Sequence, residues 1–184
     1  MTPNRLCVFC GSRPGARPEY ALAARAMGRA LAPAGLELVF GGSGGGLMGA
    51  VADGALEGGA KIIGIFPQRF PAAEFAHPRL TETHVVGSMH ERKALMHELS
   101  GGFVALPGGF GTLDELFETL TWTQIGLHHK PIGLLDTNAF YQPLMAMVRH
   151  GLAEDFVPER LKNAITIDAD PTTLVSRLIS LQTV

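Results

Sequence analysis

The sequence has few cysteines, little net charge and no long hydrophobic run, and each of these absences narrows the range of functions. The formal net charge is −2 over 184 residues, so the chain has no overall attraction to nucleic acid or to an anionic membrane, and we expect neither partner. No apolar run approaches the roughly 20 residues of a membrane span. The first residues also lack the extended apolar segment of a signal peptide, so we expect a cytoplasmic protein.

The two cysteines, Cys7 and Cys10, form a C-x-x-C pair. Such a pair can be a redox centre or half of a zinc site, but there is no second pair, and the residues between them resemble a strand interior. We therefore predict two ordinary strand cysteines. His90 and Glu91 begin an H-E-x-x-H zinc pattern, but Ala94 stands where the second histidine would be. The sequence thus predicts no metal site.

Apolar residues, by contrast, make up 46% of the chain, which is enough for one well-packed domain and little for two. Short β-branched or apolar runs alternate with segments of helical length. This alternation indicates βαβ units, a mostly parallel sheet and helices on both of its faces. The predicted strands are residues 6–10, 36–40, 62–66, 84–86, 103–106, 132–135 and 164–167. The predicted helices are residues 19–31, 47–58, 89–99, 113–125, 139–149 and 172–181.

Three connections that follow predicted strands are rich in glycine, at residues 10–15, 40–49 and 106–112. In a parallel α/β sheet, ligands bind beyond the carboxyl ends of the strands, near the switch point of the strand order. One glycine-rich turn more often reflects tight packing, but three after different strands indicate a binding site. Glycine lets the backbone approach a ligand, and a helix N-terminus offers N–H groups to an anion, so residues 106–112 suit a phosphate.

The second of these loops contains Gly44, Gly46 and Gly49 in the G-x-G-x-x-G spacing of dinucleotide-binding proteins. That fingerprint also needs an acidic residue about 20 positions later, where it holds a ribose hydroxyl. Here the next strand ends in the sequence PQR at residues 67–69, which contains no acid. The sequence therefore favours a mononucleotide or a sugar phosphate over NAD.

The predicted helix before the third loop carries Arg92 and Lys93 side by side. Two such cations can simply form a solvated helical face, and the helical pattern places Met89 and Met96 in the core. The helix, however, leads directly into the strand that ends at residues 106–112. A cation near that loop is what a phosphorylated ligand requires, so we expect Arg92 to belong to the site.

Five motifs combine these features: CGS (residues 10–12), GGSGGGLMG (41–49), MHERK (89–93), PGGFGTLDE (107–115) and WTQIGLHHKPIGLL (122–135). Together they resemble the LONELY GUY family, whose members are phosphoribohydrolases that release the base from cytokinin riboside 5′-monophosphates. The resemblance covers most of the chain. It implies a Rossmann-like, doubly wound α/β fold and a single nucleotide-binding catalytic domain over residues 1–184. It also implies a homodimer with residues of both subunits near each site, and neither cofactor nor metal.

The resemblance further implies that Arg92 and Glu115 are the catalytic pair. Breaking the bond between ribose C1′ and a purine nitrogen builds an oxocarbenium-like cation, which a carboxylate at Glu115 can stabilise while it orients or deprotonates the attacking water. Arg92 can keep Glu115 ionised, orient the ribose phosphate or assist the leaving base, and these roles stay open. We expect the phosphate on the N–H groups of residues 108–112. The candidate substrate- and phosphate-binding residues are Ser12, Gly42, Ser43, Met89, Lys93, Gly108, Gly109, Gly111 and Thr112.

Glu115 also has a purely structural interpretation. Thr112 and Glu115 have the spacing of a capping box, in which two side chains satisfy N–H groups at the start of a helix. Beside Arg92 and the other motifs we favour catalysis, with Glu115 on the first helical turn. We interpret Asp114 and Glu118 as helix-dipole, surface or secondary site residues, and Glu118, one turn further on, could face the same cleft.

Relatives of this family have been labelled lysine decarboxylases, and that label is a rival prediction. Decarboxylation of an amino acid normally needs pyridoxal phosphate on a lysine, and none of the four lysines at positions 61, 93, 130 and 162 lies in a recognisable cofactor motif. We therefore predict cleavage of an adenosine 5′-monophosphate, with or without an N6 substituent, to free base and ribose 5-phosphate. A nucleotide-binding module without catalysis is the other alternative.

Two places depart from the usual pattern of the family. The second loop has Ser43 and Gly45, which predicts a looser backbone and a changed fit of the ligand. Ser100 and Gly101 stand where a serine-aspartate pair is common, which removes a carboxylate that could support the site.

Overall fold

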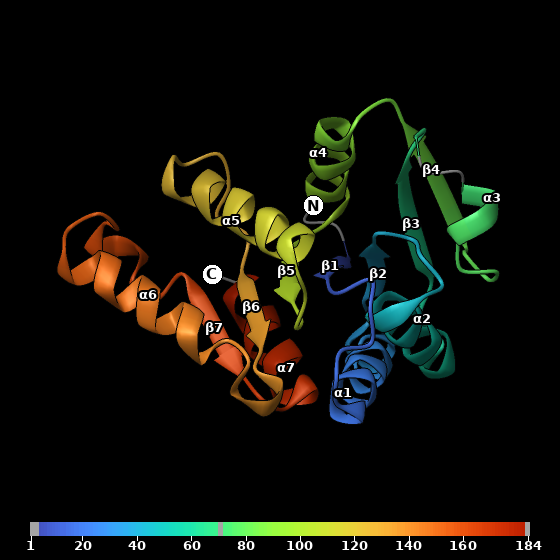
Figure 1. The fold of residues 1–184 in the computed structure, drawn as a ribbon, viewed down its shortest axis with the longest axis horizontal. Helices are drawn as coiled ribbons and strands as arrows, with labels where there is room; N and C mark the ends of the chain where they lie inside the picture. The colour runs from blue at the N-terminus through green and yellow to red at the C-terminus, as the bar shows by residue number, and fades with distance from the viewer. Residues whose placement is uncertain (1–3, 70–71, 183–184) are drawn as a thin grey trace.

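The computed structural model describes residues 4–69 and 72–182, and its strands form one seven-stranded sheet. The strand order is β4-β3-β2-β1-β5-β6-β7 (Figure 1). Every predicted strand is present with bounds close to those expected from the sequence. The strands are β1 (Arg5–Phe9), β2 (Glu37–Phe40), β3 (Ile62–Pro67), β4 (Glu82–Val86), β5 (Gly102–Ala105), β6 (Ile132–Leu135) and β7 (Ile165–Asp168).

The direction in which strands are added to the sheet reverses between β1 and β5. Strands β2, β3 and β4 are added outward on one side of β1, and then β5 pairs with the other side of β1, followed outward by β6 and β7. Leu6 of β1 accordingly pairs with Leu38 on one side and with Gly102 on the other. All these pairs are parallel. The predicted doubly wound, Rossmann-like α/β fold is therefore confirmed, with its switch point beside β1.

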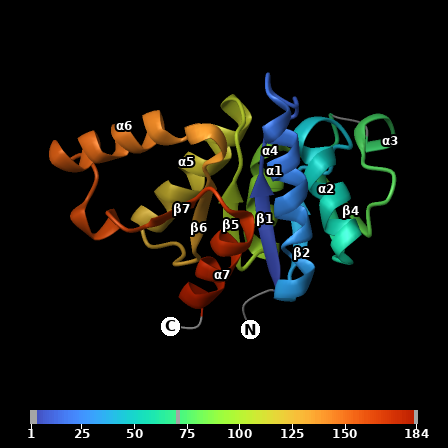
Figure 2. The same ribbon diagram turned by 90° about the horizontal axis from the view of Figure 1, so that it is seen from below.

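Helices cover both faces of the sheet, as predicted (Figure 2). One layer consists of α1 (Pro18–Arg29), α2 (Gly46–Gly58) and α7 (Pro171–Gln182), and the other of α4 (Met89–Leu99), α5 (Phe110–Gln124) and α6 (Gln142–Ala153). A short helix, α3 (Ala72–Phe75), follows β3. Within residues 4–69 and 72–182, none of the helices has the length and apolarity needed to cross a membrane.

Beyond its first residue, the central strand β1 is a continuous apolar run because both of its faces are buried. Successive side chains of a strand point to opposite faces, so Leu6 and Val8 pack under α1 and α2, whereas Cys7 and Phe9 pack under α4 and α5. Both faces are covered, so both sets must be apolar. Cys7 is buried in the strand as predicted, and Cys10 is a buried free thiol just beyond its last residue.

Two helices, α5 and α6, begin three residues away from their predicted starts. Helix α5 starts at Phe110 rather than at residue 113, because the extended Gly109 is its N-cap and Gly111 lies within its first turn. Helix α6 starts at Gln142 rather than at residue 139. Asn138 and Ala139 have φ values of 54° and 56°, and this left-handed backbone cannot continue into a right-handed helix.

Candidate active site

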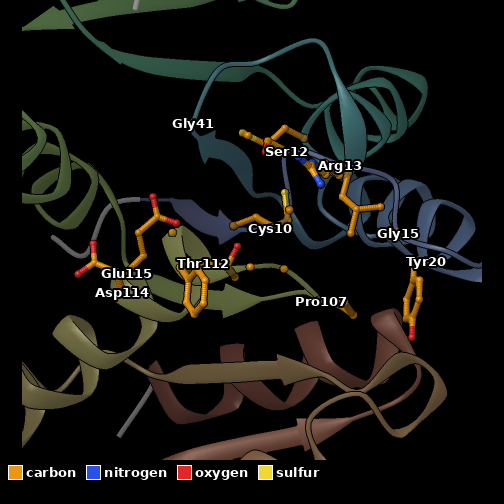
Figure 3. Close-up of a pocket in the computed structure, with 18 of the residues that line it drawn as sticks. Cys10, Ser12, Arg13, Gly15, Tyr20, Gly41, Pro107, Thr112, Asp114 and Glu115 are labelled. Atoms are coloured by element: carbon orange, nitrogen blue, oxygen red, sulfur yellow. The ribbon is translucent and has the colours of Figure 1, made fainter. Parts of the chain in front are cut away.

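A cleft of about 690 Å³ lies at the carboxyl ends of β1 and β5, at the switch point of the sheet. The loops after β1, β2 and β5 all contribute to it, together with the start of α4. Figure 3 shows Glu115 and Asp114 towards one end of the cleft, and Gly15 and Tyr20 towards the other. Its lining is formed by Val8, Cys10, Gly11, Ser12, Arg13, Gly15, Tyr20, Gly41, Leu47, Met48, Met89, Arg92, Pro107, Gly108, Gly109, Phe110, Gly111, Thr112, Asp114, Glu115 and Phe140.

Backbone hydrogen bonds tie the three glycine-rich loops to one another. The Gly11 N–H donates to the Pro107 carbonyl at 3.1 Å, and the Gly11 carbonyl accepts from the Leu47 N–H at 3.0 Å. Gly46 has a φ of 59°, and a Cβ there would lie 2.3 Å from the Ser12 carbonyl oxygen. The glycines at 44, 46 and 49 therefore serve close packing between loops, and the cleft lining includes none of the three.

The start of α5 forms the floor of the cleft. Gly109 is an extended N-cap, and its carbonyl accepts a hydrogen bond from the Leu113 N–H at 3.1 Å. The N–H groups of the preceding first-turn residues have no acceptor within the helix. They carry the positive end of the helix dipole. This end of α5 is therefore suited to an anion, as residues 106–112 predicted.

Arg92 and Glu115 form an ion pair inside the cleft. Arg92 Nη1 donates to Glu115 Oε1 at 2.8 Å, and each side chain is only 11% exposed. Arg92 Nε also donates to the Ile65 carbonyl at 2.9 Å, at the end of β3. A Cβ at Gly41 would lie 2.5 Å from Arg92 Nη2. The guanidinium is thus fixed by a strand carbonyl, a glycine and the carboxylate together.

The capping interpretation of Glu115 is wrong. Because α5 begins at Phe110, Thr112 is already inside the helix and Glu115 lies in its second turn, beyond the reach of a capping box. Burial raises the pKa of Glu115 above its ordinary value, while the charge of Arg92 and its hydrogen bond act in the opposite direction. The carboxyl group is consequently easier to protonate than a surface glutamate.

A variant of the capping box, in which Glu91 accepts from the residue before the N-cap, lies at the start of α4 and was not predicted from the sequence. Ser88 Oγ accepts from the Glu91 N–H at 3.1 Å, and Glu91 Oε2 accepts from the Gly87 N–H at 2.9 Å. The signal was present as S-x-x-E at residues 88–91. This cap fixes the first turn of α4 and so places Met89 and Arg92 at the cleft.

Lys93 does not line the cleft, although it was a candidate phosphate-binding residue. Its Nζ donates to Asp114 Oδ2 at 3.0 Å and to Glu118 Oε2 at 2.5 Å. Burial alone would lower the pKa of Lys93, but these two carboxylates outweigh it and raise that pKa. Lys93 therefore joins α4 to α5. Neither acid lies in the first turn of α5, so the helix-dipole interpretation is wrong.

Most of the other predicted binding residues reach the cleft. Its lining contains Ser12, Met89, Gly108, Gly109, Gly111 and Thr112. Met89 is 43% exposed, so its predicted place in the core is wrong, whereas Met96 is buried as predicted. Gly42 and Ser43 do not line the cleft. Gly42 has a φ of 81° against the Phe66 ring, and the Ser43 side chain accepts from the Gly45 N–H.

The charged and aromatic lining side chains that were not marked from the sequence as site residues are Arg13, Tyr20, Phe110 and Phe140. Arg13 was visible inside the CGSRPG loop, and Phe110 inside PGGFGT. Tyr20 and Phe140 come from distant segments and meet edge to face, with ring centroids 6.1 Å apart. No local pattern marked that pair, since only folding brings α1 beside the turn before α6.

The two departures from the family pattern, at Ser43 with Gly45 and at Ser100 with Gly101, lie outside the described lining of the cleft. The Gly101 N–H donates to the Arg5 carbonyl at the amino end of β1, so a carboxylate there would lie at the edge of the sheet opposite the cleft. The loop with Ser43 is not loose, because Ser43 pairs with Ala76 and the His77 N–H donates to the Gly42 carbonyl. The expectation of a looser loop is therefore wrong.

The lysines do not fit a pyridoxal phosphate site. No lysine lines the cleft as far as the structure describes the chain. Lys61 pairs with Glu37, Lys130 donates to the His97 carbonyl and Lys162 pairs with Glu159. In the same described part of the chain, no group of three His, Cys, Asp or Glu side chains has the arrangement of a metal site. Burial raises the pKa of the Cys10 thiol, so this cysteine stays protonated.

The chain is similar to proteins of a known family. The family model described as "Possible lysine decarboxylase" matches residues 48–178. The chain is 46% identical over 170 residues to the cytokinin riboside 5′-monophosphate phosphoribohydrolase of Rhodococcoides fascians, covering 92% of this chain and 86% of the relative. It is 45% identical over 154 residues to a probable phosphoribohydrolase of the same name from Oryza sativa subsp. japonica, covering 84% and 69%.

A solved structure supports the fold. The molybdenum cofactor carrier protein of Chlamydomonas reinhardtii has a TM-score of 0.74 at 22% identity, with 100% of both chains covered. At this low identity the likeness concerns the architecture alone.

Proposed function

The chain belongs to the LONELY GUY family of phosphoribohydrolases, described also as possible lysine decarboxylases, and we propose that it hydrolyses adenosine 5′-monophosphates. The products are the free base, with or without an N6 substituent, and ribose 5-phosphate. The observation that carries the proposal is the Arg92–Glu115 ion pair at 2.8 Å inside a cleft floored by the start of α5. The absence of a lysine from the described lining argues against the decarboxylase alternative.

The ligand lies along the cleft in an order that follows from the positions of its charged groups. The N–H groups at the start of α5 attract the 5′-phosphate. Glu115 is one turn deeper in the helix, at the end of the cleft away from Tyr20 (Figure 3). The ribose therefore extends from the phosphate towards Glu115, which brings C1′ close to its carboxylate. This order separates the two negative charges that would otherwise repel each other.

Hydrolysis then requires only groups of this chain and water. As the bond between C1′ and the base nitrogen breaks, the base leaves with the electron pair and positive charge develops on the ribose. The proton that the base takes up comes from the attacking water, by way of Glu115. Glu115 stabilises that charge and accepts a proton from the water that attacks C1′. Arg92 holds and orients Glu115, since its Nη1 already donates to Oε1. The charge of Arg92 also opposes the effect of burial on the pKa of Glu115, which supports the first of the three roles open for Arg92, that of keeping Glu115 ionised.

Product analysis tests the proposal. The purified protein is incubated with AMP and with isopentenyladenosine 5′-monophosphate, and the mixture is separated by chromatography. We expect free adenine or isopentenyladenine together with ribose 5-phosphate. Binding of either nucleotide without release of base would show a nucleotide-binding module instead, and evolution of CO₂ from lysine with added pyridoxal phosphate would show a decarboxylase.

We also infer a cytoplasmic homodimer. Phe110 and Phe117 lie seven residues apart on α5, on the same face of the helix, and are 93% and 45% exposed. Phe110 is at the cleft, so a second copy of the chain that covers this face would contribute to the site. Cys7 and Cys10 are free thiols, which fits a reducing compartment. Cell fractionation tests the location.

A further inference from the structure

The cleft is lined by two arginines that are bonded very differently. Arg92 already donates to Glu115 and to the Ile65 carbonyl. Arg13 is exposed, and among the residues that the structure describes its side chain has neither an acidic partner nor a hydrogen bond. Arg13 is therefore the lining cation that is free to bind a ligand.

The backbone of Arg13 is nevertheless held in place. A Cβ at Gly46 would lie 2.7 Å from the backbone nitrogen of Arg13. The start of α2 therefore packs directly against the backbone of Arg13. Gly11, two residues earlier, is bonded to Pro107 and Leu47 of the other two loops. Figure 3 shows Ser12 and Arg13 between the Glu115 end of the cleft and the Tyr20 end. The exposed side chain therefore extends from a fixed backbone position in the loop that is bonded to Pro107.

The charges of the lining call for such a cation. Both carboxylates of the described lining already have cationic partners, Glu115 with Arg92 and Asp114 with Lys93. A phosphate brings further negative charge to this cleft, and these two cations are already engaged by carboxylates. Arg13 can offset the charge of the phosphate, and its planar guanidinium can donate two hydrogen bonds to one phosphate.

We propose that Arg13 binds the 5′-phosphate of the substrate from the side opposite the start of α5, and thereby selects nucleoside 5′-monophosphates over nucleosides. This inference rests on the proposed function and adds a specificity residue to it. A charge-assisted hydrogen bond lost from a binding site typically weakens binding about 10–100-fold. Removing the Arg13 guanidinium should therefore raise KM for the phosphorylated substrate by that factor.

Steady-state kinetics of Arg13→Gln, with Arg17→Gln as the control, tests the inference. Arg17 is exposed just before α1, four residues along the same loop, and does not line the cleft. For Arg13→Gln we expect KM for AMP to rise at least about tenfold with kcat changed less than about threefold, and any slow cleavage of adenosine to stay unchanged. Arg13→Lys should recover part of the loss because it restores the charge without the fork. Arg17→Gln should behave as the wild type.

Calorimetry with AMP and with ribose 5-phosphate measures the affinity of the protein for each ligand without requiring the reaction. It therefore tests the role of Arg13 separately from the proposed hydrolysis. If the wild type binds AMP but releases no base, the proposed function fails, while weaker binding of both ligands to Arg13→Gln still supports the role of Arg13. Equal KM and equal binding in Arg13→Gln and the wild type would overturn the inference. A wild type that binds neither ligand would overturn it as well.

Discussion

Glu115 owes its chemistry to its surroundings in the fold. It is almost fully buried, its one strong partner is Arg92, and burial raises its pKa despite that partner. The folded protein thus holds the charged form of Glu115 less readily than water does. A carboxylate in this condition accepts a proton more readily than a surface glutamate, which agrees with the role proposed for it in taking a proton from the attacking water.

The variant Glu115→Gln separates catalysis from packing. The amide oxygen can still accept from Arg92 Nη1, and no capping function is lost, so we expect the free energy of unfolding to change by roughly 1 kcal/mol or less. The rate should fall at least about a hundredfold, because an amide neither stabilises the cation nor accepts a proton. Melting temperature, AMP affinity and base release are measured on one preparation. Glu118→Gln, one turn along the same helix and outside the cleft lining, is the control and should stay active.

Gly41 offers a second test at the residue scale. A Cβ there would meet Arg92 Nη2 at 2.5 Å and Met48 Sδ at 2.7 Å. Both are ends of flexible side chains, so Gly41→Ala should fold, but it should displace the guanidinium from Glu115 and slow the reaction about 10–100-fold. In the same loop, a Cβ at Gly45 would come no closer than 3.7 Å, to Ser43 Oγ, so Gly45→Ala should keep its activity. Equal rates for the two variants would argue against the positioning role of Arg92.

At the scale of elements, α4 and α5 are joined by polar contacts behind the site. His97 Nε2 of α4 lies 3.0 Å from Thr119 Oγ1 of α5, and that hydroxyl donates to the Glu115 carbonyl at 2.7 Å. The ring of His97 also packs between Phe103 and Trp122. Burial, with the nearby charges of His128, Lys130 and Lys93, lowers the pKa of His97 to about 4.

The low pKa of His97 predicts acid sensitivity. In the unfolded chain this histidine has an ordinary pKa near 6.5, so between about pH 6.5 and pH 4 the unfolded chain binds a proton that the folded protein does not. The contribution of neutral His97 to stability is therefore complete above about pH 6.5 and is lost as the pH falls towards 4. At pH 5 this single group should cost on the order of 2 kcal/mol of unfolding free energy. His97→Gln should therefore lose less stability than the wild type between pH 7 and pH 5 in urea titrations. Exposed His90 is the control position, and an identical pH dependence of His97→Gln and the wild type would refute the assignment.

At the scale of the whole molecule, α5 links the cleft to an exposed apolar face. That face includes Phe117, and further exposed apolar side chains follow at Ile125 and Leu127. Large exposed apolar patches on soluble proteins commonly mark interaction sites. Since the face starts with Phe110 at the cleft, association and activity should depend on each other.

Light scattering with activity assays at the same concentration tests the dimer. We expect the wild type to be dimeric, and Phe117→Asp to be monomeric and much less active, because a buried unpaired charge opposes association. Phe156→Asp, which changes an 84% exposed side chain between α6 and β7, should remain dimeric and active. A wild-type monomer with full activity would disprove the inferred dimer.

The sequence by itself determined the fold class and predicted the edge of the sheet at which the candidate cleft lies. Continuous apolar strands alternating with helices specify a parallel sheet covered on both faces, because only burial on both sides tolerates such strands. Glycine-rich turns after three strands predicted where a ligand would bind, since the carboxyl ends of parallel strands share one edge. Arg92 and Glu115 were both identified as candidates from motifs that lie near each other in the chain.

Only the tertiary structure decided how individual side chains are used. Lys93 and Arg92 are neighbours in sequence, but the helix turns them about 100° apart, so one pairs with Asp114 and Glu118 while the other enters the cleft. The start of α5 at Phe110 removed the capping role of Glu115. Tyr20 and Phe140 meet only because α1 and the turn before α6 pack together. Local patterns fix periodicity and turns, whereas contacts between distant segments depend on how the layers pack, and no local pattern encodes that packing.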